Sequence, residues 1–83
     1  LKDNYPNPFN PVTNIQNSIP NRQHVRLQVY DMVGRLVQTL VDEEKPAGYY
    51  TFQFDATHLA SGVYLYRMQT GGMVKTGRMT LIK

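Results

Sequence analysis

The 83-residue chain has no cysteine, which excludes a disulfide framework, a cysteine metal site and a cysteine nucleophile. It has no tryptophan, which argues against a face built for stacking on sugar rings. No apolar run approaches the roughly 20 residues that span a bilayer. The chain also lacks an initiator methionine and a charged-then-apolar leader. We therefore expect Leu1, Lys2 and Asp3 to follow a cut made just ahead of a domain in a longer protein.

The residues that are present have the composition of a small folded domain. Hydrophobic residues make up 41% of the chain and charged residues 18%, which is too apolar for a disordered segment. A chain of this size buries only about 60% of the surface that its unfolded form exposes. We therefore expect residues 1–83 to form one domain with one modest core.

Charge is distributed unevenly along the chain. Residues 42–55 carry a net charge of −3, from four acids and Lys45, whereas residues 67–83 carry +4. The positive charge comes from Arg67, Lys75, Arg78 and Lys83. Such a cluster could meet an acidic protein, an anionic glycolipid surface or nucleic acid, or it could simply keep a solvated sheet edge soluble.

Alternation of apolar and polar side chains, the period of a β-strand, dominates the sequence. It predicts strands over residues 13–20, 24–31, 35–41, 49–55, 63–70 and 73–83. The third of these also fits one helical turn, and the first is a weak pattern. Tyr50, Phe52 and Phe54 mark the fourth as a core strand. Because the last pattern continues to Lys83, we expect the chain to stop inside a strand, which makes the carboxyl end a candidate functional part.

Glycines and polar residues mark the connections between these strands. Gly34 can adopt a positive φ and is predicted to turn the chain, and Gly71 and Gly72 predict a two-residue hairpin. Residues 42–48 are expected to form a polar loop. Gly77 lies inside the last strand pattern and predicts a bulge or a close backbone approach.

Three prolines, Pro6, Pro8 and Pro11, restrict the start of the chain because they fix φ and lack backbone donors. We expect this segment to be an extended lead-in along a sheet edge, with Tyr5 and Phe9 packed inward. All these patterns together predict an all-β fold, an antiparallel immunoglobulin-like β-sandwich of six to seven short strands.

The sequence offers little for catalysis. His24 lies at the start of a strand and His58 in a turn, and no serine or carboxylate stands at a spacing that indicates a triad. Asp42, Glu43 and Glu44 are adjacent acids beside a lysine, which is typical of a solvated loop. We therefore expect a protein that is not an enzyme.

Oxygen ligands for a cation gather near the N-terminus, at Asp3, Asn4, Asn7 and Asn10. They lack the spaced acidic residues and the glycine of a dedicated calcium loop, and asparagine beside proline is typical of turns. We expect neither a metal nor a cofactor.

Tyrosine rings could form a sugar-binding face, since they stack on pyranose rings and donate hydrogen bonds. Tyr30, Tyr49, Tyr64 and Tyr66 are equally explained by cross-strand pairing or core packing. Nucleic acid is a poor candidate partner, because the cations of the last strand have no glycine-aromatic RNA signature near them.

Five segments carry a family resemblance. They are residues 4–11 (NYPNPFNP), 30–35 (YDMVGR), 46–48 (PAG), 59–64 (LASGVY) and 75–83 (KTGRMTLIK). In this order, over essentially the full chain, they resemble the C-terminal sorting domain of type IX secretion cargo proteins. The resemblance implies an immunoglobulin-like β-sandwich, related to that of flagellar hook-capping proteins. It also implies a domain that follows an enzyme or adhesin and that the outer-membrane export machinery reads as an address.

The resemblance implies partners and location as well. The partners would be the export machinery, an upstream cargo domain and, in many members, a sortase-like peptidase that removes the domain and joins the cargo to lipopolysaccharide. The protein would pass through the periplasm to the cell surface or be secreted, and the domain would be a ligand and not a catalyst. The residues that match the family motifs, and so would carry partner recognition, are Pro6, Asn7, Pro8, Gly62, Val63, Tyr64, Lys75, Arg78, Met79, Leu81 and Lys83.

Two asparagines depart from the family pattern. Asn14 stands where a threonine is usual, and Asn17 where an aromatic residue is usual. Asn17 falls on the same inward face as Ile15 and Ile19, so it needs a hydrogen-bond partner.

Two other functions are compatible with the sequence. One is an accessory module that holds a polysaccharide-degrading enzyme on its substrate, and the other is a spacer or a weak homodimer formed through exposed edge strands. A sorting address must end its protein, so the strand pattern at the carboxyl end favours secretion sorting over both.

Overall fold

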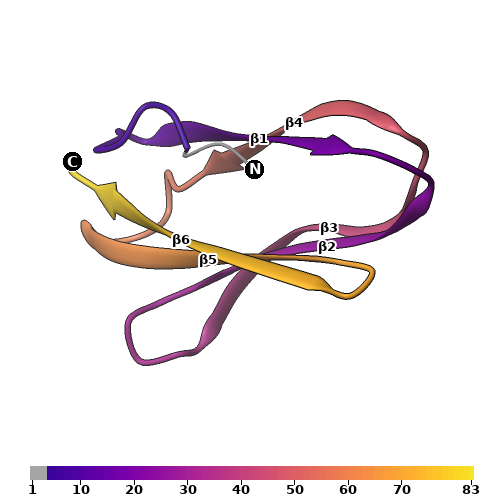
Figure 1. Cartoon of the computed structure of the whole chain (residues 1–83). Coiled ribbons are helices and arrows are strands. Elements are labelled where there is room, and N and C mark those ends of the chain that lie inside the picture. The colour runs from indigo at the N-terminus through magenta and orange to yellow at the C-terminus, as the bar shows by residue number, and fades with distance from the viewer. Residues whose placement is uncertain (1–3) are drawn as a thin grey trace.

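The computed structural model describes residues 4–83, which form six strands in two antiparallel sheets (Figure 1). The strands are β1 (Val12–Ile19), β2 (Gln23–Tyr30), β3 (Leu36–Lys45), β4 (Gly48–Asp55), β5 (Gly62–Thr70) and β6 (Met73–Leu81). β1 pairs with β4, and the other sheet has the order β3-β2-β5-β6. The predicted antiparallel β-sandwich is confirmed.

The core lies between the two sheets and is formed by the alternate side chains of each strand that point inward. In β2 the three side chains Val25, Leu27 and Val29 have no exposed surface, while their neighbours face solvent. The other sheet contributes Ile15 and Phe54, which are also fully buried. The prediction that 49–55 is a core strand is only partly met, because its two other inward aromatic side chains are half-buried.

β3 is longer than the sequence predicted. Residues 42–45, expected in a loop, form the end of the strand and pair with the start of β2. Here Arg26 Nε lies 3.3 Å from Asp42 Oδ1, and Arg22 Nε lies 3.3 Å from Glu44 Oε1. Opposite charges across an antiparallel pair are compatible with a strand. The prediction of a loop was wrong because it rested on the polarity of one strand without its partner.

The predicted turns are present. Gly34 has a φ of 86° between β2 and β3, and Gly71 has a φ of 50° in the hairpin that pairs Thr70 with Met73. Gly77 forms no bulge, since the β5–β6 register is continuous there. Instead the ring of Tyr66 takes the place of its missing side chain, with ring atoms 2.2 Å from where a Cβ would stand. The close approach is therefore to a side chain and not to backbone.

The two ends differ from the predictions in detail. Phe9 is buried as expected, but Tyr5 is 78% exposed and the neighbouring Asn4 is buried in its place. Successive side chains of an extended segment point to opposite faces, so either Asn4 or Tyr5 can face the core. The hydrogen bonds of Asn4 to Thr13 and Pro6 stabilise the arrangement in which Asn4 is buried. The last strand ends at Leu81 and not at Lys83, because Ile82 leaves the ladder to bond with the N-terminal segment.

Candidate functional site

The three motif regions of the sequence meet at one end of the sandwich. The ladder between β5 and β6 places Gly62 opposite Leu81 and Tyr64 opposite Met79. The indigo N-terminal segment lies at the same end as the yellow C-terminus (Figure 1). Phe9 forms a parallel bridge with Leu81, so it joins the proline segment to the last strand. We call residues 4–9, 61–64 and 78–83 the terminal site.

The N-terminal segment bridges the two sheets. At one side Tyr5 and Asn14 exchange both backbone hydrogen bonds, at 3.0 and 2.9 Å, which fixes the segment to β1. At the other side the Phe9 amide donates to the carbonyl of Thr80 (2.9 Å), and the Ile82 amide donates to the carbonyl of Phe9 (3.0 Å). The predicted lead-in along a sheet edge is confirmed, and it ties β1 in one sheet to β6 in the other.

Asn7 substitutes for a neighbouring strand on β6. Its side-chain amide donates to the carbonyl of Arg78 (3.1 Å), and its side-chain oxygen accepts from the amide of Thr80 (3.0 Å). A backbone peptide offers the same pair of groups in a ladder, so one side chain satisfies two edge groups that water would otherwise hold.

Asn4 shapes the proline segment from inside. Its side-chain amide donates to Thr13 Oγ1 (3.0 Å) and to the carbonyl of Pro6 (3.3 Å), and the Thr13 hydroxyl donates to the same carbonyl (2.8 Å). Asn4 and Thr13 are the two buried polar residues of the described chain. Because their polar groups are hydrogen-bonded, these two side chains give the segment a defined shape.

The carboxyl end is anchored to the connection between β4 and β5. The Lys83 amide donates to Ser61 Oγ (3.0 Å), and its ammonium donates to the carbonyl of Thr57 (2.5 Å). The hydroxyl and amide of Thr57 hydrogen-bond the carboxylate of Asp55, which together with the nearby charges of His58 and Lys83 lowers the pKa of that carboxyl below its ordinary value of 3.8. The carboxyl end thus has a fixed position.

The predicted recognition residues divide into two groups. Tyr64, Met79 and Leu81 are buried in the core, and the hydroxyl of Tyr64 donates to the carbonyl of Ala60 (2.7 Å). Gly62 and Val63 are half-buried. The exposed members are Pro6, Asn7, Pro8, Lys75, Arg78 and Lys83. A role of all eleven in recognition stays a prediction, and only the exposed group offers side chains to a partner.

Cations of residues 22–45 and of residues 67–83 have different surroundings. Within residues 4–83, the salt bridges join Arg22, His24, Arg26, Arg35 and Lys45 to acids. No salt bridge of the described chain includes Arg67, Lys75, Arg78 or Lys83. Residues 22–45 therefore pair their cations with acids, whereas Arg67, Lys75 and Arg78 of β5 and β6 are exposed and have no acidic partner among residues 4–83.

The groups considered for chemistry do not form a catalytic or metal site in the part of the chain that the structure describes. His24 Nε2 lies 2.5 Å from Asp42 Oδ1 in an exposed cross-strand pair, and His58 is exposed in the connection after β4. No three side chains among His, Asp and Glu gather within residues 4–83. Of the four oxygen ligands considered near the N-terminus, Asp3 lies outside the described residues.

Tyrosines form no common platform. Tyr64 and Tyr66 are buried, whereas Tyr49 is 93% exposed on the other sheet. Residues 4–83 contain no helix with the length and hydrophobicity that crossing a bilayer requires.

Sequence reasoning did not single out Thr13, Thr57 or Ser61, which hold the terminal site together. Thr57 and Ser61 bond to Lys83, 26 and 22 positions away, and Thr13 bonds to Asn4 and Pro6 across the proline segment, whose path the strand patterns do not predict. The mixture of asparagine and proline in residues 4–11 was the available signal, and it indicated turns without showing what the asparagine side chains bind.

Comparison with known protein families shows to which family the chain belongs. Residues 3–83 match the family described as the secretion system C-terminal sorting domain. The chain belongs to this family. Searches of the curated proteins and of the solved structures return no match.

The sorting domain is the C-terminal signal of the type IX secretion system, so it marks a cargo for export to the cell surface or for secretion. It interacts with the secretion machinery and is carried by a cargo, and domains of this family are in general not catalytic. Of the five segments that resemble the family, the structure brings parts of three, 4–11, 59–64 and 75–83, together in the terminal site.

Proposed function

We propose that the secretion machinery reads the two joined ends of this domain as one surface. The observation that carries the proposal is the pair of hydrogen bonds from Asn7 to Arg78 and Thr80, 71 and 73 residues away in the sequence. Because of these bonds, the proline motif and the last strand present a single surface to a partner.

Buried and exposed motif residues have different tasks in this proposal. Met79, Leu81 and Tyr64 pack in the core and hold the backbone of the terminal site in place. Arg78 and Lys83 are exposed and unpaired with acids, so they suit acidic groups on the machinery.

The domain is a ligand in this proposal, and the chemistry belongs to its partners. An enzyme or adhesin upstream supplies the activity of the whole protein. A sortase-like peptidase removes the domain after export and attaches the cargo at the cell surface. Residues 1–83 act as one module, with no catalytic group of their own.

Export of a reporter protein fused in front of residues 1–83 tests the proposal in a bacterium that has type IX secretion. Deletion of residues 79–83 should abolish export, and normal secretion of that truncated fusion would contradict the proposal. The deletion also removes two core side chains, Met79 and Leu81, so a milder variant is needed.

The milder variant is Arg78→Gln with Lys83→Gln, since both side chains are exposed and neither joins a salt bridge of the described chain. Its control is Arg22→Gln with Arg35→Gln, which removes the same charge far from the terminal site and also breaks two exposed salt bridges, each of which contributes little to stability. We expect export of the first variant to fall at least several-fold and export of the control to match wild type. An equal loss of export in both variants would mean that net charge, and not this surface, is read, and wild-type export of both would contradict a role of Arg78 and Lys83.

A further inference from the structure

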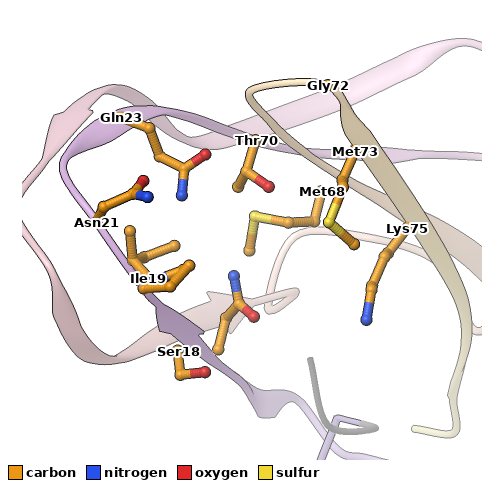
Figure 2. Close-up of a pocket in the computed structure, with 11 residues that line it drawn as sticks. Ser18, Ile19, Asn21, Gln23, Met68, Thr70, Gly72, Met73 and Lys75 are labelled. Atoms are coloured by element: carbon orange, nitrogen blue, oxygen red, sulfur yellow. The ribbon is translucent and has the colours of Figure 1, made fainter.

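The seam between the two sheets is closed at one end and open at the other. β1 and β6 are the edge strands on this side, and residues 5–9 bridge them near the chain ends. Beyond the bridge lies a groove of about 470 Å³ (Figure 2). Side chains of β1 and β6 face each other across it, with Met68 and Thr70 of β5 between them.

The β6 edge beside this groove has backbone groups without a strand partner. Residues of a strand point their backbone groups alternately to either side. Thr80 bonds away from β5, to Asn7 and Phe9, so Val74 and Thr76 direct their amides and carbonyls to the same open side. Among the residues that the structure describes, the N-terminal segment bonds to this edge only as far as Arg78. The edge is therefore capped over its last residues and open over the first half of β6.

The opposite wall has an open edge as well. Asn14 bonds to Tyr5 on the side of β1 that faces away from β4, so Gln16 and Ser18 have their backbone groups on that side too. Ser18 lines the groove. Two edges with regularly spaced donors and acceptors thus face one trough.

The groove also has side chains that select an occupant. Ile19 and Met68 form an apolar, almost fully buried floor, and Met73 is an exposed apolar side chain at the rim. Lys75 is the one charged residue of this lining, and no salt bridge within residues 4–83 neutralises it. An occupant needs an apolar side chain for the floor and a carboxylate for Lys75.

We propose that this groove receives an extended segment of the secretion machinery, which adds as a strand along Val74 and Thr76 and places a carboxylate against Lys75. Strand addition suits this site because an open edge offers main-chain hydrogen bonds at the strand repeat, and a pocket beside the edge selects alternate side chains. The inference rests on the proposed function, and it adds the chemistry of the bound segment and where it binds.

Charge favours this occupant over a second copy of the chain. Two β6 edges that paired with each other would bring together the unpaired cations Lys75 and Arg78 of both copies. Like charges opposite each other destabilise a strand pair. An acidic segment gains from the same charges.

The test uses the reporter fusion with two pairs of variants. Thr76→Pro removes only an amide that faces the open edge, whereas Thr76→Val keeps that amide. Lys75→Glu reverses the charge in the groove, and Arg67→Glu makes the same change on the outer face of the sheet. We expect at least a tenfold loss of export for Thr76→Pro and Lys75→Glu, and export near wild type for the two controls.

Thermal unfolding of the fusion's sorting domain separates recognition from folding. Both Thr76 variants should melt within about 5 °C of wild type, a shift that a small domain shows on a minor loss of stability. If Thr76→Pro does not fold, export of Lys75→Glu compared with export of Arg67→Glu tests the inference. Loss of export in both charge variants, or in neither, overturns the inference.

A fusion that lacks residues 1–83 gives the reference for the proposed function. If this deletion leaves export unchanged, the proposed function fails. If the deletion abolishes export while Lys75→Glu and a folded Thr76→Pro are exported normally, only the groove inference fails. Sedimentation could also show a dimer that Thr76→Pro dissociates. If that variant were still exported normally, the groove would bind a second copy of the chain, and the inference would be overturned.

Discussion

Asn7 does at the edge of β6 what a neighbouring strand would do, with one side chain bound to Arg78 and Thr80. Asn7→Ala removes both hydrogen bonds and leaves the two backbone groups to water. At roughly 0.5–1.5 kcal/mol for each bond, we expect the free energy of unfolding to fall by about 1–2 kcal/mol. Urea denaturation of the domain measures this loss.

Asn10→Ala is the matched control for that experiment. Asn10 is exposed in the same segment, and no side-chain hydrogen bond of residues 4–83 includes it. Its replacement should change the free energy of unfolding by less than about 0.5 kcal/mol. Equal effects of the two substitutions would show that Asn7 has no special role at the β6 edge.

Gly77 lies in an ordinary strand conformation, so the ring of Tyr66 and not the backbone angle explains why glycine fits there. A Cβ would clash with the Cζ and hydroxyl oxygen of Tyr66, and Tyr66 is almost fully buried, which limits its movement. Gly77→Ala should therefore destabilise the domain by about 1–3 kcal/mol, as overpacking does.

A double-mutant cycle checks the cause of this loss. With Tyr66→Ala present, the ring is gone and Gly77→Ala should cost little or nothing, which gives a coupling energy well above experimental error. Additive effects in urea denaturation would exclude contact with the ring as the reason.

At the scale of elements, the pairing of β2 with β3 depends on charge. His24 first and then Arg26 hydrogen-bond the carboxylate of Asp42 and lower its pKa below the ordinary 3.8. A carboxyl group whose pKa is lower in the folded state adds stability that is complete above its unfolded pKa and disappears as pH falls through the folded value. The urea midpoint should therefore decrease as pH falls below about 3.8.

Asp42→Asn isolates the share of that carboxylate. The variant should be less stable than wild type at neutral pH and should lose less stability on acidification. The remaining slope comes from Asp31, whose pKa is lowered first by the backbone amide of Arg35, and from Asp55, whose pKa is lowered first by the hydroxyl of Thr57. A wild-type slope in the variant would refute the role of Asp42.

Alternation was sufficient to predict most strands, since burial on one face of a sheet imposes a period of two on β2, β4 and β5. It failed at residues 42–45, where the acids are stabilised by cations of another strand that a local pattern does not contain. It also failed at Tyr5, because an extended segment has two faces and only Asn4's contacts with Thr13 select one.

The candidate site was harder to predict than the fold. Motifs identified its segments, but the bond between Asn7 and Arg78 joins residues 71 positions apart. No local pattern contains such a contact. The motif also does not distinguish core residues from surface residues. Met79 packs in the core and Lys75 faces the groove, although both belong to the same motif on β6.

For the whole molecule, the two ends of the chain support one fold. Removal of residues 1–10 takes away the buried Phe9, the buried Asn4 and the Asn7 clamp together. Loss of a buried phenylalanine ring alone costs about 3–5 kcal/mol, and a whole domain is stable by only about 5–15 kcal/mol, with small domains at the lower end. The chain that starts at Pro11 should therefore lack a cooperative unfolding transition.

Circular dichroism and amide proton dispersion in NMR spectra measure this outcome, and two full-length variants show its cause. Phe9→Ala should remain folded but should lose a large part of the free energy of unfolding that the truncation removes. Tyr5→Ala should be close to wild type in stability, because the Tyr5 side chain is 78% exposed and bonds to β1 through its backbone. A truncated chain that still unfolded cooperatively would mean that β6 holds its position without the N-terminal segment. That result would contradict the dependence of β6 on the N-terminal segment, which bonds to it through Asn7 and Phe9.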